Sequence, residues 1–220
     1  MEYYSKSAMY QFINELNFVR KIYEKNNLAY HNFTHILDCL NEFNNHIHIN
    51  LADKSRTYDF ILAILYHDIV YVPGAEDNEE QSFNLFKEYN QHINEGDRFN
   101  YIENIILSTK IPKTYNPKIS TKSFKSSTEA KMMHDIDYAG FSWDFNEYIK
   151  ISNAIWEENK NICGRKLFLE KRIEFLESIN KDRIYYYKIT LESKAHENIN
   201  KELEILNREL RIFKAGRGYE

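Results

Sequence analysis

The chain contains few of the residues that form turns. Only six glycines and three prolines occur among its 220 residues, whereas a fold of many short strands needs a turn signal about every 8–12 residues. This shortage excludes most all-β architectures and favours long helices. We therefore predict an all-α fold, a helical bundle that forms a single domain over residues 1–220, with the C-terminal helices at about 163–220 packing on its core.

Cysteines and long apolar runs are also scarce. The two cysteines, Cys39 and Cys163, form no C-x-x-C pair, which is typical of a protein in a reducing compartment. No uncharged stretch is long enough to span a membrane, and residues 1–25 mix charged with aromatic residues, unlike a signal peptide. We therefore expect a cytoplasmic protein without a membrane partner.

The chain has no excess of positive charge. Its formal net charge is −4, and basic and acidic residues are interspersed. A protein that binds a nucleic-acid polymer usually carries a basic face that neutralises phosphates. The charge pattern therefore argues against nucleic acid as a partner.

What the chain does contain is a pair of ionisable residues at the end of an apolar run. The run covers residues 60–65 and predicts a buried helix, which delivers His67 and Asp68 at its end. Buried ionisable groups are tolerated when they are paired, hydrogen-bonded or bound to a metal, so this pair is the first candidate for chemistry. The alternative is structural, with His67 capping the helix C-terminus and Asp68 in a turn.

Further histidines and acidic residues lie near predicted helix ends. His31 and His35 are four residues apart and would share one face of a helix. Asp135 and Asp137 lie among apolar residues, where a carboxylate needs a cationic partner. Residues 76–80 place four carboxylates at the start of a helix, where the helix dipole alone can explain some of them.

Together these positions suggest a metal site with nitrogen and oxygen ligands. The set consists of His35, His67, Asp68 and either Asp137 or Asp135. His31 is an alternative to His35. Two imidazoles and two carboxylates suit a borderline divalent cation such as Mn²⁺, Fe²⁺ or Zn²⁺. Because the set holds no cysteine, we exclude a soft thiolate site.

Several short motifs are spread over most of the chain. They are Tyr30-His31-Asn32 with His35-Ile36, then His67-Asp68-Ile69-Val70-Tyr71, then Asp77-Asn78-Glu79 with Ser82, and further on Asp135-Ile136-Asp137, Gly164-Arg165 and the segment Glu192–Leu203. These motifs resemble a bacterial subfamily of the HD superfamily of predicted metal-dependent phosphohydrolases, in which the order H…HD…D occurs on an all-helical chain. The resemblance implies a fold of the HD-domain type.

The resemblance also implies a ligand set. One divalent metal ion would be held by His35, His67, Asp68 and Asp137. The resemblance favours His35 over His31 as the first ligand, with His31 as a ligand or a substrate contact, and it favours Asp137 over Asp135. We expect Mn²⁺, with Fe²⁺, Zn²⁺, Co²⁺ and Mg²⁺ as alternatives.

The implied activity is hydrolysis of a phosphate ester or anhydride of a small molecule, expected to be a nucleotide. A bound cation lowers the pKa of its water and polarises a phosphoryl oxygen. Asp77 or Glu79 is expected to orient that water or to protonate the leaving group. The candidates for substrate binding are His31, Asn32, Asn78, Lys110 and Arg165.

Other interpretations stay open. The chain could be a nucleotide or alarmone pyrophosphohydrolase, or a non-catalytic helical protein that binds a metal or a nucleotide. It could also be an interaction protein that uses the apolar seam of its last predicted helix, Ser193–Phe213, and a homodimer is an open alternative. The segment 111–127 holds two of the three prolines and is interpreted as a flap over the site.

Overall fold

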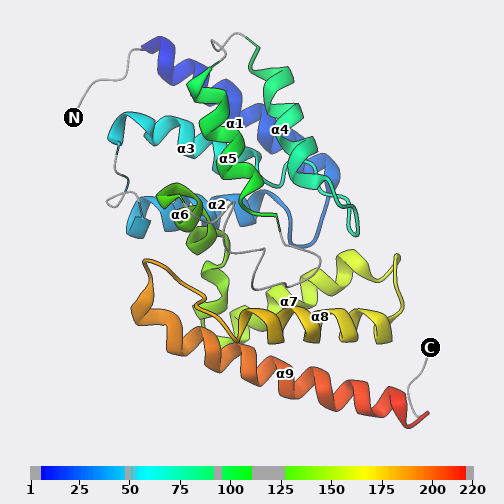
Figure 1. Cartoon of the computed structure of the whole chain (residues 1–220). Helices are drawn as coiled ribbons and strands as arrows, with labels where there is room; N and C mark the ends of the chain where they lie inside the picture. Colours follow the sequence, from blue (N-terminus) through cyan, green and yellow to red (C-terminus); the bar gives the residue numbers. More distant parts are fainter. Residues whose placement is uncertain (1–5, 48–50, 52, 92–95, 111–126, 217–220) are drawn as a thin grey trace.

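The structure, a computed structural model, describes residues 6–47, 51, 53–91, 96–110 and 127–216. These residues form nine α-helices and no strand, which confirms the predicted all-α class (Figure 1). The helices are α1 (Lys6–Asn26), α2 (Phe33–Glu42), α3 (Thr57–Tyr66), α4 (Asn78–Tyr89), α5 (Asp97–Leu107), α6 (Thr128–Asp137), α7 (Phe145–Asn159), α8 (Arg165–Ile179) and α9 (Glu192–Lys214). The segment interpreted as a flap lies, apart from Ser127, outside the described residues.

The helices form two groups, and each group has an apolar core. Helices α1 to α6 surround a first cluster that includes Ile36, Phe60 and Ile106. Helices α8 and α9 enclose a second cluster with Leu169 and Ile199, and Figure 1 shows α7, α8 and α9 together on one side of the other helices. The C-terminal helices thus have a core of their own, and a single domain over residues 1–220 stays a prediction.

Helix α3 is the apolar helix that the sequence predicts. Phe60 and the residues from Leu62 to Tyr66 are buried. The helix follows a 3-10 turn, Lys54–Arg56, which is capped by the side chain of Asp53. It ends at Tyr66, so that His67 and Asp68 follow directly, as the sequence predicts. No helix among the described residues is both long and apolar enough to cross a membrane.

The two groups of helices are joined by buried polar contacts. The carboxylate of Asp135 on α6 accepts hydrogen bonds of 2.7–3.1 Å from the backbone N–H groups of Tyr186, Tyr187 and Lys188. The Lys188 ammonium in turn lies 2.6 Å from a carboxylate oxygen of Glu42 on α2. Both side chains of this ion pair are nearly buried, so the segment before α9 is held against α2 and α6.

The seam predicted on the last helix faces the inside of the protein. Ile199, Leu206 and Leu210 of α9 belong to the second cluster and pack with residues of α8. Ile205 and Ile212, on another side of the same helix, are exposed. The seam is therefore covered by the chain's own residues, and a homodimer stays a prediction.

Candidate metal site

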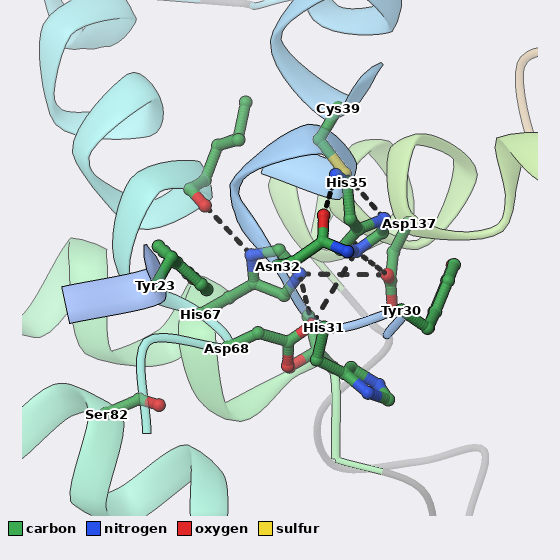
Figure 2. A network of polar contacts seen from close by, with 12 residues as sticks. Tyr23, Tyr30, His31, Asn32, His35, Cys39, His67, Asp68, Ser82 and Asp137 are labelled. Atoms are coloured by element: carbon green, nitrogen blue, oxygen red, sulfur yellow. Dashed lines mark hydrogen bonds and ion pairs between the residues drawn. The ribbon is translucent and has the colours of Figure 1, made fainter. Parts of the chain in front are cut away.

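Four polar side chains from three parts of the chain meet at one place (Figure 2). His35 lies on α2, His67 and Asp68 follow α3, and Asp137 is the last residue of α6. These four residues are the set predicted from the sequence, and the structure brings them together. Nε2 of each histidine and one carboxylate oxygen of each aspartate form a ring of four donor atoms, in which nitrogens alternate with oxygens.

Neighbouring donor atoms around this ring lie 3.1–3.7 Å apart. Nε2 of His35 lies 3.2 Å from Oδ1 of Asp137 and 3.6 Å from Oδ2 of Asp68. Nε2 of His67 lies 3.1 Å from Oδ2 of Asp68 and 3.7 Å from Oδ1 of Asp137. Ligand bonds of about 2.0–2.2 Å to one ion place neighbouring donor atoms roughly 3.0–3.5 Å apart. The four observed distances are close to that spacing.

The ring of His67 is oriented by the end of α3. Its Nδ1 lies 2.9 Å from the backbone carbonyl of Ile64. In the neutral imidazole this contact places the proton on Nδ1 and the lone pair on Nε2, as is usual for a metal-binding histidine. Nε2 is buried and faces the carboxylate oxygens of Asp68 and Asp137. Because buried carboxylates need a cationic partner, a cation at this place would stabilise the arrangement.

Burial and the neighbouring charges shift the pKa values of three of the four donor residues, His67, Asp68 and Asp137. Burial would raise the pKa of Asp137, but hydrogen bonds from His35 and His67 hold it well below its ordinary range. Burial would likewise raise the pKa of Asp68, yet the charges of His67 and His31 lower it. For His67, burial lowers the pKa, and the two carboxylates outweigh this and raise it well above its ordinary value. Both aspartates are therefore ionised at neutral pH, the form in which they bind cations.

The position of His35 follows from the start of α2. Asn32 caps this helix, because its side-chain oxygen accepts from the backbone N–H groups of Thr34 and His35 at 2.8 and 3.3 Å. Its amide nitrogen donates to the carbonyls of Leu28 and Ala29. Asn32 therefore fixes the turn before the helix, and its predicted contact with substrate stays a prediction.

Cys39 belongs to the same cluster, one helical turn after His35 (Figure 2). His35, Cys39, His67 and Asp137 each offer a donor atom, and these atoms lie within 4.8 Å of one another, so the buried group could hold a metal ion. The ligand set predicted from the sequence contains no sulfur, and that prediction missed the helical spacing of four residues between His35 and Cys39.

The sulfur of Cys39 lies slightly farther from His35 than the carboxylate oxygens of Asp68 and Asp137 do. Sγ lies 3.8 Å from Nδ1 and 3.7 Å from Nε2 of His35. Because these two distances are nearly equal, the sulfur does not lie along the lone pair of either nitrogen. Burial, together with the charges of Asp137 and Asp68, raises the pKa of the thiol well above its ordinary value. Oδ2 of Asp68, at 3.1 Å from Nε2 of His67, is the fourth donor that the sequence predicts in place of Cys39, and its role as a ligand stays a prediction.

Two side chains of α4 hold the loop that follows Asp68. Oγ of Ser82 accepts from the N–H of Val70 at 3.1 Å and donates to the carbonyl of the same residue at 3.2 Å. The amide of Asn78 makes the same pair of bonds with Val72, at 3.0 and 3.1 Å. The HD motif and the later D-N-E and Ser motif are thus one structural unit, which sets the position of the intervening Tyr71. The predicted substrate contact of Asn78 stays a prediction.

His31 lies beside the ring of donors and not within it. It stacks on Tyr71 with the ring centroids 3.4 Å apart, and its centroid is 6.4 Å from that of His35. Nδ1 of His31 lies 2.7 Å from a carboxylate oxygen of Glu158 on α7. Glu158 also accepts from the backbone N–H groups of Tyr30 and His31. These bonds, together with the charge of His31, lower the pKa of Glu158 although burial would raise it.

A pocket of about 300 Å³ opens beside the donors. Asp68, Asp137, His31 and Glu79 line one part of it. Burial raises the pKa of Glu79, and the charge of Asp68 adds to this rise. A carboxyl group with a raised pKa exchanges its proton more readily near neutral pH. Glu79 lines the same pocket as Asp68 and Asp137, and its catalytic role stays a prediction.

Three other predicted residues are not among those that line this pocket. Asp77 is exposed at the start of α4. Lys110 pairs with Glu80 at the surface. The guanidinium of Arg165 makes two hydrogen bonds of 2.8 Å with Glu209. Asp135, the alternative to Asp137, is bonded to the backbone before α9 and does not join the ring.

Two charged residues at apolar positions of the helices were not identified as site residues from the sequence. Glu158 continues the helical spacing of Ile151 and Ile155 on α7 and is buried against residues 30–31. Glu202 lies three residues after Ile199 in the seam of α9 and is fully buried. Such a charge inside an apolar stripe must be paired, and this signal could have identified both residues.

In comparisons with protein-family models, with curated proteins and with solved structures, nothing matches this chain. The fold and the site define an all-α protein with a buried group of His, Asp and Cys residues that could hold one metal ion.

Proposed function

We propose that this protein is a metal-dependent phosphohydrolase of the HD type, which hydrolyses a phosphate ester or anhydride of a small molecule, a nucleotide. The observation that carries the proposal is the ring of donors formed by His35, His67, Asp68 and Asp137, with distances of 3.1–3.7 Å, of which Asp68 and Asp137 line a pocket of about 300 Å³. The resemblance of the sequence motifs to the HD superfamily supports the same conclusion.

The two imidazoles and two carboxylates would hold one divalent cation. Mixed nitrogen and oxygen donors favour Mn²⁺, Fe²⁺, Co²⁺ or Zn²⁺ over an ion that prefers oxygen alone, and we expect Mn²⁺. When bound, the ion supplies a water of lowered pKa and polarises a phosphoryl oxygen.

The remaining residues of the pocket bind and orient the substrate and handle its proton. Glu79 can protonate the leaving group or take a proton from the attacking water, because burial raises its pKa toward neutral pH. His31, held by Glu158 and Tyr71, is placed to donate a hydrogen bond to a phosphate oxygen. Asp77, which the sequence names as an alternative to Glu79, is exposed outside the pocket lining.

The first experiment measures metal content. We expect about one equivalent of a transition metal in the purified wild-type protein, or after loading with Mn²⁺, and much less in Asp68→Ala. Asp144→Ala is the matched control, because Asp144 is an exposed aspartate that pairs with Lys194 away from the site. If wild type and Asp68→Ala hold the same amount of metal, the proposed ligand set is wrong.

Activity is tested next on the metal-loaded protein. A panel of phosphorylated nucleotides is screened by the release of phosphate or pyrophosphate. Activity that disappears in both His67→Gln and Asp137→Asn, and is retained in His196→Gln on α9, supports the proposal. A protein that binds metal but hydrolyses none of these compounds would instead be a non-catalytic metal-binding protein.

A further inference from the structure

The pocket beside the metal site has two chemically different parts. The part that the proposed function uses contains Asp68, Asp137, His31 and Glu79. The other part is walled by the aromatic rings of Phe141, Tyr148, Phe168 and Phe175, and it contains the buried Arg172. Nothing in the proposed hydrolysis requires an arginine among aromatic rings, so this part calls for its own explanation.

Arg172 is held in place by Glu202 of α9. Nε and Nη2 of the guanidinium lie 2.9 and 3.2 Å from the two carboxylate oxygens of Glu202. The side chain of Arg172 is only 7 % exposed, and that of Glu202 is fully buried. Glu202 also accepts hydrogen bonds from the hydroxyls of Tyr148 and Ser152. This network fixes the orientation of the guanidinium in the wall of the pocket.

The network also decides which ligand suits Arg172. A guanidinium has five N–H donors, and Glu202 uses two of them in these bonds while it neutralises the charge. A second anion near the pair would approach the carboxylate of Glu202 and lose its own hydration. A neutral acceptor gains a hydrogen bond to a charged donor without that cost.

The aromatic walls add a requirement of shape. Phe141, Phe168 and Phe175 line the same pocket, and the Arg172 guanidinium lies 5.4 Å from the ring centroid of Phe175. Aromatic rings and a planar guanidinium favour stacking with a flat, apolar face. A pocket of about 300 Å³ is at the small end of ligand sites, which leaves space for one such group next to the phosphate.

We propose that the part of the pocket formed by Phe141, Phe168, Phe175 and Arg172 is a recognition subsite for a neutral, planar aromatic group that carries hydrogen-bond acceptors, a nucleobase. Arg172 is its specificity-determining residue. The inference rests on the proposed function only in assigning the phosphate to the metal end. It favours a nucleoside monophosphate over a substrate whose far end carries further phosphates.

The test uses nucleosides, which have a base and no phosphate. Binding of each of the four ribonucleosides to the full chain is measured by isothermal titration calorimetry, for wild type and for Arg172→Gln. We expect at least one nucleoside to bind wild type, and Arg172→Gln to weaken that binding by about 10-fold or more. If no nucleoside binds with a Kd below about 1 mM, the proposal is wrong.

A second variant covers the case in which Arg172→Gln does not fold. Ile155 lines the pocket and is not part of the ion pair, so Ile155→Trp fills the subsite and should abolish nucleoside binding. Ile162→Trp is the matched control, because Ile162 is exposed outside the pocket, and it should bind like wild type. If Ile155→Trp binds nucleosides as well as wild type does, the subsite is not where we place it.

Asp68→Asn separates this inference from the proposed function. We expect Asp68→Asn to bind nucleosides within about 2-fold of wild type, since Asp68 is not one of the residues that form the proposed subsite. Nucleoside binding that is lost in Ile155→Trp and kept in Asp68→Asn supports the subsite even if no metal is found. If Asp68→Asn loses nucleoside binding as fully as Ile155→Trp does, the base binds at the metal end and the inference is overturned.

Discussion

Oδ1 of Asp137, at the end of α6, lies 3.2 Å from Nε2 of His35, in the first turn of α2. Asp68 faces the same nitrogen at 3.6 Å. The ionised carboxylates of Asp68 and Asp137 repel each other, and the buried imidazoles of His35 and His67 hold them in place. A divalent cation would relieve that repulsion.

Removal of the metal should lower stability. An ion that binds only the folded protein stabilises it by about 2.7 kcal/mol when its free concentration is about 100 times Kd. For a chain of this size, this corresponds to a fall in Tm of roughly 5–11 °C on adding a chelator. Differential scanning fluorimetry measures the shift. The same treatment should hardly change the Tm of Asp137→Asn, and equal shifts in both proteins would contradict the prediction.

The two aspartates of α6 should have separable roles. Asp135→Asn weakens charge-assisted bonds to the backbone of residues 186–188, so it should lower the free energy of unfolding by about 1.5–3 kcal/mol and keep the metal. Asp137→Asn should lose the metal, and it should also lower the stability of the metal-free protein, because it removes the carboxylate charge that pairs with His35 and His67. Urea unfolding combined with metal analysis distinguishes the two. Loss of metal in Asp135→Asn alone would reverse our assignment.

Ser82 should stabilise the loop after Asp68. Ser82→Ala leaves the backbone N–H and carbonyl of Val70 without the bonds that Ser82 makes, at a cost of about 1–3 kcal/mol in the free energy of unfolding. Ser178→Ala is the control, because the Ser178 hydroxyl bonds only within its own helix, to the carbonyl of Phe175. Chemical denaturation should show a clear loss for Ser82→Ala and little change for Ser178→Ala.

The Arg172–Glu202 pair should make stability depend on pH. Burial would raise the pKa of Glu202, but Arg172 and the neighbouring hydroxyls lower it below its ordinary value of 4.5. A carboxylate with a lowered pKa contributes stability that is fully present above pH 4.5 and is lost as the pH falls below it. Glu202→Gln should therefore lose about 3–5 kcal/mol at neutral pH and show a weaker loss of stability in acid.

A similar ion pair at the surface tests whether burial strengthens the Arg172–Glu202 pair. Arg165 and Glu209 make a similar two-bond contact, but both side chains are partly exposed. Glu209→Gln should therefore cost only about 0–1 kcal/mol. Urea unfolding between pH 3 and pH 7, on both variants, measures the difference. Equal losses in the two variants would show that burial does not strengthen the Arg172–Glu202 pair.

Glu79 should be needed for turnover and Asp77 should not. Loss of a general acid or base lowers kcat by about 100- to 10,000-fold, so Glu79→Gln should be nearly inactive on the nucleotide found in the screen while it keeps its metal. Asp77→Asn should stay close to wild type, because Asp77 is exposed outside the pocket lining. A loss of activity in Asp77→Asn alone would exchange the two roles.

Much of the candidate site was visible in the sequence. His67 and Asp68 stand out because they end an apolar run, and a buried ionisable pair needs a partner. The pairing of Asn78 with Val72 and of Ser82 with Val70 was not visible, because a polar side chain can bond to many backbone groups and only the folded loop selects one. Cys39 was missed for a related reason, since its position beside His35 matters only when α2 packs against α3 and α6.

By itself, the sequence determined the all-α class and the placement of His67 and Asp68 at the end of a buried helix. Both follow from local patterns, the shortage of turn residues and the run of apolar side chains. The residues alone left Asp135 and Asp137 as alternatives and the resemblance favoured Asp137, but only the tertiary structure shows that Asp137 faces the ring of donors while Asp135 is bonded elsewhere. Residues two apart on a helix point roughly 200° apart, so one of the two must face elsewhere, and the packing of α6 against its neighbours selects which one.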